Sequence, residues 1–184
     1  MKPLISTLAL LAFMGTAQAQ TFQWDINIEH YTIKGESGEA LMAQMEKRGP
    51  HLKDKPLSDR AWAASFIKFV NGTYSPCFMR MHVDIIMPRW LDYDKASPTS
   101  QVYWDKFYAD VMKHEMTHVG HYKAQEDFIK ANKCNNKAII QAFERGNKLG
   151  EKFDAIDHGI PPEITNIQPY INPVADAPIP LLTD

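Results

Sequence analysis

The segment KHEMTHVGHY, residues 113–122, places three histidines and one glutamate within ten residues. Two of the histidines, His114 and His118, are four residues apart, so on an α-helix they lie one turn apart on the same face. Two imidazole nitrogens in that arrangement can both reach one metal ion at about 2.0–2.1 Å. The pair therefore predicts a metal site, for which the alternative is a set of core histidines hydrogen-bonded to ordinary acceptors.

Glu115 completes the pattern H-E-x-x-H, which reads HEMTH in this chain. On a helix Glu115 lies about 100° around the axis from His114, near a metal ion but outside the row of ligands. A carboxylate in that place can act as a general base and take a proton from a water molecule that the metal activates. The pattern is typical of zinc-dependent peptidases, so we predict Zn2+ as the cofactor.

A catalytic zinc site needs a third protein ligand. His121 is a candidate, but it lies about 10.5 Å along the helix axis from the first histidine, so we expect it to line the cleft instead. The segment DAIDHG follows a second predicted helix and can fold back toward the metal. We therefore favour His158 as the third ligand, with Asp154 or Asp157 as the carboxylate that orients it or as an alternative ligand.

A long helix must carry these groups. Its start is predicted at Ser97–Pro98, its pattern runs on to about Asn132, and the histidines fall on its apolar stripe. A second helical pattern over residues 139–153 is expected to pack against it. Alternating apolar and polar residues predict strands over residues 22–33, 61–74 and 77–88. The predicted fold class is α+β, with a small antiparallel sheet packed on two main helices, the longer carrying H-E-x-x-H in a zincin-like arrangement.

The N-terminus has the three regions of a secretory signal peptide: Lys2, an apolar run over residues 4–14, and the small residues Ala17 and Ala19 before a cleavage site. We predict that cleavage follows Ala19 and removes residues 1–19. The mature protein is then periplasmic or secreted. No later segment is long and apolar enough to anchor it in a membrane.

Composition places the rest of the chain among globular proteins. With 45% hydrophobic residues, 23% charged residues and a formal net charge of -2, it lacks the basic excess of a nucleic-acid-binding protein. Prolines are frequent from residue 161 onward, so residues 161–184 are predicted to form an extended or disordered tail after a metal-binding domain of residues 20–160. In an oxidising compartment Cys77 and Cys134 are expected to pair, the alternative being two buried thiols.

The sequence as a whole resembles domain of unknown function 922, a bacterial family described as predicted secreted zinc-dependent proteases. The similarity extends from Thr21 to Gly159 and is carried by HYTIKG, the turn RGP, MPRW, YWDKF, HEMTH and the two cysteines. The resemblance implies a zincin-like domain and a disulfide bond between Cys77 and Cys134. The chain departs from the family pattern near its end, where Phe153 stands in place of a tyrosine and the segment before the final histidine-glycine is one residue shorter.

The predicted function is that of a secreted or periplasmic zinc-dependent metallopeptidase, in which zinc-activated water attacks a peptide bond and Glu115 is the general base. Its partner is a peptide or protein substrate, which the strand over residues 77–88 is expected to align by edge pairing. There are two alternatives: a non-catalytic zinc-binding periplasmic protein, and an inhibitor or assembly factor that acts through the proline-rich tail. Nucleic acid and, after signal cleavage, a membrane are not expected partners.

Overall fold

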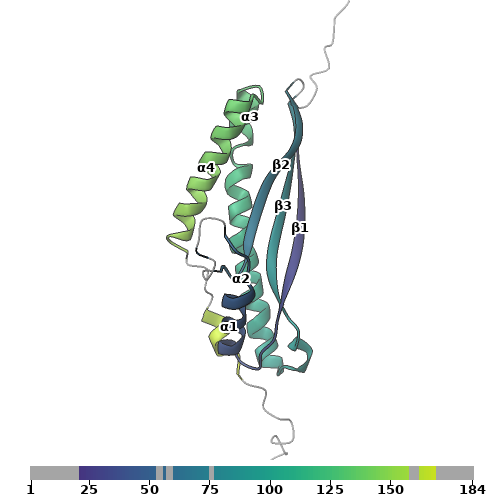
Figure 1. Cartoon of the computed structure of the whole chain (residues 1–184), viewed down its shortest axis with the longest axis vertical. Coiled ribbons are helices and arrows are strands. Elements are labelled where there is room, and N and C mark those ends of the chain that lie inside the picture. The colour runs from purple at the N-terminus through teal and green to yellow at the C-terminus, as the bar shows by residue number, and fades with distance from the viewer. Residues whose placement is uncertain (1–20, 53–55, 57–59, 75–76, 158–161, 169–184) are drawn as a thin grey trace, which may run out of the picture.

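The structure, a computed structural model, describes residues 21–52, 56, 60–74, 77–157 and 162–168. Its elements in chain order are β1 (Thr21–Ile33), α1 (Gly38–Arg48), β2 (Ala64–Tyr74), β3 (Cys77–Trp90), the 3-10 turn η1 (Tyr93–Lys95), α2 (Pro98–Lys123), α3 (Glu126–Ala131), α4 (Asn136–Asp154) and the 3-10 helix η2 (Pro162–Asn166). Helix α2 lies between the sheet and α4 (Figure 1). The fold is therefore α+β, as predicted, whereas the predicted signal peptide lies outside the described residues.

The three strands form a mixed sheet in the order β1-β3-β2. β2 is antiparallel to β3, but β1 runs parallel to β3, so the prediction of an antiparallel sheet is wrong for β1. The connections explain the difference: β2 and β3 follow each other with two residues between them, which suits an antiparallel pair, whereas α1 and β2 intervene between β1 and β3, a connection long enough for parallel pairing. β3 also has an apolar inner face whose side chains are at most 2% exposed (Met79, Met81, Val83, Ile85 and Met87). The most apolar strand takes the centre of the sheet, and β1 and β2 become its edges.

The start of α2 is fixed by a cap. The Ser97 side chain accepts a hydrogen bond from the backbone N–H of Ser100, and Pro98 takes the first helical position. The helix buries one row of side chains (Trp104, Phe107, Val111, Glu115 and Val119). The three histidines lie beside this row and are only half-buried. α2 ends at Lys123 rather than at Asn132, and a separate helix, α3, begins after a two-residue break.

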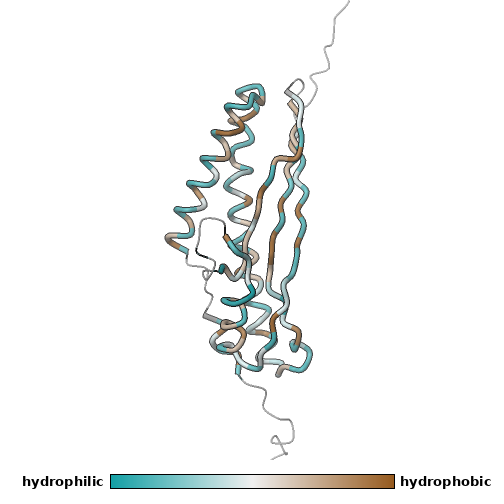
Figure 2. Tube along the Cα trace, viewed as in Figure 1, coloured by the Kyte–Doolittle hydropathy of each residue, from teal (hydrophilic) through white to brown (hydrophobic). Residues whose placement is uncertain are grey.

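The core consists of two apolar clusters. The larger lies between the sheet, α1 and α2, and is completed by η2. The smaller joins the start of β3 to α3 and α4. Apolar and polar residues are interleaved along α4 and the strands (Figure 2). Among the described residues, none of the helices has the length and apolar character needed to cross a membrane.

A disulfide bond joins Cys77, the first residue of β3, to Cys134, which follows α3. The two Cα atoms are 5.7 Å apart, and the bridge spans 57 residues of sequence. Lys133 and Cys134 have left-handed backbone angles, with φ of 53° and 52°, in the turn between α3 and α4. The predicted pairing is confirmed, and closing a loop of this length is worth about 4 kcal/mol in the chain-entropy model.

Residues 162–168 pack into the core, although they belong to the segment predicted as an extended tail. Ile164 is 0% and Ile167 is 3% exposed. The Gly38 N–H donates a hydrogen bond to the Ile167 carbonyl, and a Cβ added at Gly38 would lie 1.8 Å from the Ile164 carbonyl oxygen. Burial of two isoleucines stabilises a segment that proline content alone would leave extended. Residues 169–184, the remainder of the predicted tail, lie outside the described part of the chain.

The packing of η2 makes a prediction about stability. Replacing the fully buried Ile164 by alanine should lower the free energy of unfolding by about 2–5 kcal/mol, because it removes buried methyl groups and leaves a cavity. The matched control is Ile140→Ala on α4, where the side chain is 59% exposed and the expected change is within about 0.5 kcal/mol. Urea unfolding measures both, and equal transition midpoints would show that η2 is not part of the core.

Candidate metal centre

His114 and His118 lie one turn apart on α2, and Asp154 is the last residue of α4. The Nε2 atoms of the two histidines are 3.1 Å apart. The Asp154 Oδ1 atom lies 3.3 Å from Nε2 of His114 and 3.0 Å from Nε2 of His118. The three atoms form a nearly equilateral triangle, and together they can hold one metal ion.

The size of the triangle fits a tetrahedral ion. Metal–ligand bonds of about 2.0–2.1 Å at tetrahedral angles put neighbouring ligand atoms about 3.3 Å apart. Two imidazoles and one carboxylate are a ligand set of catalytic zinc sites, and imidazole also suits other transition ions. The donor set therefore fits Zn2+ in both distance and chemistry.

The second ring nitrogen of His114 supports the same assignment. A neutral imidazole that binds a metal through Nε2 carries its proton on Nδ1 and donates it to a neighbouring acceptor. Nδ1 of His114 is buried and has no hydrogen-bond partner within the described part of the chain. An oxygen of Asp157, Oδ2, lies 3.5 Å from this nitrogen. Asp157 thus lies beside His114 without a hydrogen bond to this nitrogen, whereas the prediction had it orient His158.

Two glycines on α4 allow it to approach α2 closely at the site. A Cβ added at Gly146 would lie 2.8 Å from the ring of Tyr122, and one added at Gly150 would lie 3.1 Å from Nδ1 of His118. Both glycines are buried. Asp154 follows Gly150 by one helical turn, so the close approach of the two helices is what brings its carboxylate to the histidines.

The ring of Phe153 packs against the histidines. Its centre lies 4.7 Å from the ring centre of His114, 5.5 Å from that of His118 and 5.7 Å from that of His121. Burial lowers the pKa of His118, although the nearby Asp154 carboxylate acts in the opposite direction. A lowered pKa favours the neutral imidazole, which is the form that binds a metal.

Glu115 lies on the buried face of α2, between Val111 and Val119, and is only 5% exposed. Burial raises the pKa of Glu115 to about 7, although His114 and hydrogen bonds from Ser65 of β2 act in the opposite direction. A carboxyl group with a pKa near neutrality can both accept and return a proton. The prediction that the histidines occupy the core face is wrong: Glu115 occupies it, and the histidines lie beside it.

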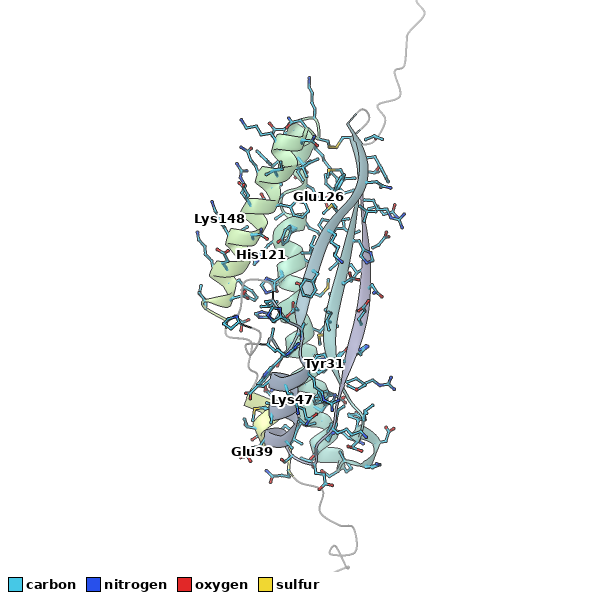
Figure 3. The ribbon with its side chains drawn as sticks, viewed as in Figure 1. Tyr31, Glu39, Lys47, His121, Glu126 and Lys148 are labelled. Carbon is cyan, nitrogen blue, oxygen red and sulfur yellow. A yellow bond between two sulfur atoms is a disulfide. The ribbon has the colours of Figure 1, made fainter. Side chains whose placement is uncertain are left out.

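The remaining predicted site residues are not part of the triangle. His121 lies on α2 between α4 and the sheet (Figure 3), and its ring centre is 6.2 Å from that of His118. It therefore lies next to the triangle without contributing a donor atom to it, and its expected place in a cleft stays a prediction. His158, the favoured third ligand, lies outside the described residues. Asp154, which the sequence analysis named as an alternative ligand, supplies the third donor atom of the triangle, and ligation by His158 stays a prediction.

The two glycines of α4 are the functional feature that the sequence reasoning missed. Glycine is unfavourable inside a helix by about 1 kcal/mol relative to alanine, so a glycine at such a position often has a packing reason. Gly146 and Gly150 are four residues apart and so share one face of α4. Their spacing was the available signal for a close helix–helix contact.

The close helix contact leads to a prediction with a control on the facing helix. Gly146→Ala should lower metal affinity by about tenfold, because the new methyl group forces α4 away from Tyr122. Tenfold is the smallest loss expected when the groups that position a metal ligand are disturbed. Gly120→Ala on α2 meets nothing within 4 Å and should leave the affinity unchanged while stabilising the helix by about 1 kcal/mol. Zinc titration by calorimetry compares the two, and equal affinities would show that the helix distance does not control the site.

The third ligand can be tested directly. Asp154→Asn keeps the size of the side chain but removes its charge, and zinc affinity should fall by at least about 100-fold, since loss of an outer partner alone costs 10–100-fold. The control is Asp127→Asn, at a carboxylate that is 97% exposed and distant from the triangle, which should bind zinc like the unaltered protein. If Asp154→Asn also retained full affinity, Asp154 would not be a ligand.

Comparison with known proteins gives one family match. A family model described as "Bacterial protein of unknown function (DUF922)" matches residues 28–155. No curated protein and no solved structure matches the chain. The matched residues run from β1 to the end of α4 and include the three donor residues, Glu115 and both cysteines.

Proposed function

The chain belongs to the DUF922 family of bacterial proteins, whose model matches more than half of its length, and we propose that it is a zinc-dependent metallopeptidase. The observation that carries this proposal is the triangle of Nε2 of His114, Nε2 of His118 and Oδ1 of Asp154, with edges of 3.0–3.3 Å. A buried carboxyl group, Glu115, follows the first of these residues on the same helix. Ligands and base together are the parts that hydrolysis at zinc requires.

The proposed site residues have separate roles in the reaction. A bound Zn2+ would polarise a peptide carbonyl and lower the pKa of water. His114, His118 and Asp154 would hold the ion. The Glu115 carboxylate accepts a proton from the attacking water and then returns it to the nitrogen of the leaving amine, so it ends the cycle as it began.

Ser65 connects this base to the sheet. It lies on β2 and donates hydrogen bonds to the Glu115 carboxyl, which holds the carboxyl in place. The prediction that the strand at residues 77–88 aligns the substrate is wrong, because β3 is paired on both sides. β2 is an edge strand next to the base, and we assign to it the alignment of an extended substrate by backbone hydrogen bonds.

We also propose that the protein is exported from the cytoplasm. The disulfide between Cys77 and Cys134 is consistent with an oxidising, extracytoplasmic location. The N-terminal sequence adds the signal-peptide pattern that ends at Ala19. We therefore propose that the mature protein acts in the periplasm or outside the cell.

A non-catalytic zinc-binding protein is the second candidate, and the burial of Glu115 favours it. A carboxyl group that is 5% exposed and hydrogen-bonded to Ser65 must be reached by water before it can act as a base. If water does not reach it, the same three ligands bind zinc and the ion stabilises the packing of α2 on α4.

Replacing Glu115 by glutamine separates the two candidates. For a peptidase, hydrolysis of an unfolded protein such as reduced and alkylated casein should fall by about 100- to 10,000-fold while the zinc content stays the same, because only the base is lost. Glu151→Gln changes an exposed carboxylate on α4 and is the control, with full activity expected. If the unaltered zinc-loaded protein cleaves no protein or peptide substrate, the non-catalytic function is correct.

A further inference from the structure

The inner face of β1 is uncovered along its middle. Ile26 and Ile28 are paired with Val83 and Ile85 of β3 and point to the same side of the sheet. Val83 and Ile85 are 0% exposed, whereas Ile26 and Ile28 are 40% and 46% exposed. Helix α2 therefore covers the central strand but leaves this edge strand open on the same face.

Helix α2 borders the open face. Its Tyr108 hydroxyl lies 2.9 Å from Nε2 of His30, and its Lys123 ammonium lies 5.5 Å from the ring centre of Trp24. The contacts are about 20 Å apart along β1 and about 22 Å apart along α2, so strand and helix run side by side in opposite directions. Met116, which is 37% exposed, lies two turns beyond Tyr108 between the two contacts. We call Ile26, Ile28 and Met116 the β1 shelf.

A pocket of about 450 Å3 lies at the His30 end of the β1 shelf. Half of its ten lining residues are aromatic (His30, Trp90, Tyr93, Trp104 and Tyr108). The rings of His30 and Tyr108 are stacked, with their planes 14° apart. At the other end of the strand, the Trp24 indole donates a hydrogen bond of 2.6 Å to Glu126, which Figure 3 labels near α3. The shelf is thus bounded by a pocket at one end and by a fixed tryptophan at the other.

The pocket is suited to a cation. Two exposed carboxylates, Asp94 and Asp105, line it, and the Tyr93 hydroxyl donates a hydrogen bond of 2.9 Å that orients Asp105. One guanidinium, Arg89, lines it as well, so the carboxylates outnumber the fixed cations of the pocket. Aromatic faces attract a Lys or Arg head group, and carboxylates bind it through charge-assisted hydrogen bonds.

We propose that β1 binds an extended peptide segment as a fourth strand, with the segment's apolar side chains on the β1 shelf and a Lys or Arg side chain in the aromatic pocket. The outer edge of β1 supplies the backbone hydrogen bonds, because the described residues of the chain pair β1 with β3 alone. Alternate side chains of an added strand point to the same face as Ile26 and Ile28 and would remove them from water. The partner is therefore a polypeptide with alternating apolar residues and one basic residue.

A second copy of this chain is a poorer occupant of the same edge. β1 contains no Lys or Arg, so a second copy that pairs through its own β1 brings no basic side chain of that strand to the pocket. A basic segment instead meets the carboxylates of Asp94 and Asp105 there.

This binding site is separate from the metal centre. His118 and its Asp154 partner lie between α2 and α4, whereas Tyr108 and Lys123 contact β1. The two sets of side chains therefore occupy different flanks of α2. A peptide on β1 leaves the metal ligands free, so its binding does not depend on hydrolysis.

The test uses three short capped peptides on the purified protein. The first alternates valine and threonine around a central lysine, the second has glutamate in place of the lysine, and the third keeps the lysine but has proline at two alternate positions. Calorimetry measures binding, and tryptophan fluorescence, to which Trp90 and Trp104 in the pocket contribute along with Trp24 and Trp62, gives a second signal. The lysine peptide should bind, and each of the others should bind at least about tenfold more weakly, because a charge-assisted contact or backbone hydrogen bonds are lost.

Variants of the pocket complete the test. Asp94→Asn combined with Asp105→Asn should weaken binding of the lysine peptide by about tenfold, whereas Asp127→Asn should not change it. Arg89→Gln should leave binding equal or make it tighter. Equal binding of the lysine and glutamate peptides, full binding of the proline peptide, or loss of binding in Arg89→Gln would each overturn the proposal. Circular dichroism of the variants confirms that the surface substitutions leave the fold intact.

Discussion

The distance between α2 and α4 is the constraint on which the candidate site depends. Two donor nitrogens come from one helix and the donor oxygen from the other, so the triangle exists only while the helices stay close. Gly146 and Gly150 leave no side chain in the gap, and the Tyr122 ring and His118 fill it from the other helix. The disulfide at Cys134 anchors the chain just before α4 begins, at the end of α4 far from Asp154. Packing along the whole length of α2 and α4 therefore sets the positions of the three donor atoms near the C-terminal end of α4.

The sequence predicted the local features of this site and missed the feature that depends on three-dimensional packing. The spacing of His114 and His118 determines their relation on any helix, and the predicted signal peptide and the family resemblance were enough to predict the disulfide. The third donor depends on how far α4 lies from α2 and where it ends, and periodicity does not report either quantity. The sheet likewise has features that the local sequence pattern does not determine. Alternation predicts β3 as a strand, but its central position depends on how much of each strand is buried, and the parallel pairing of β1 depends on the path of the long connection through α1 and β2.

Glu115 illustrates what a helical wheel does and does not determine. The helical wheel gives the angle between Glu115 and His114, but it does not show which of these two side chains points toward the sheet. In the structure the carboxyl group lies between Val111 and Val119 under β2. Burying a carboxyl group there costs free energy that an apolar residue would not, and burial raises the pKa of Glu115 to about 7. The metallopeptidase proposal gives this costly side chain a role as the base, whereas the non-catalytic alternative gives it none.

α2 organises the molecule because it takes part in every site described above. One flank carries the candidate metal ligands, its buried face carries Glu115, the proposed base, and the opposite flank borders the β1 shelf and the aromatic pocket. The helix is held at its N-terminal half by the larger core cluster, which includes Trp104 and Phe107. Its functional side chains therefore project from a rigid element rather than from loops, which keeps donor atoms in place before a ligand arrives.

X-ray absorption at the zinc edge of the zinc-loaded protein tests the central claim most directly, because it reports the number and kind of ligand atoms. The account predicts about four ligand atoms around zinc: two imidazole nitrogens and one carboxylate oxygen at about 2.0–2.2 Å, and one water. A spectrum with three or more imidazoles would show that Asp154 is not the third ligand. Absence of stoichiometric zinc after loading would contradict the metal site altogether.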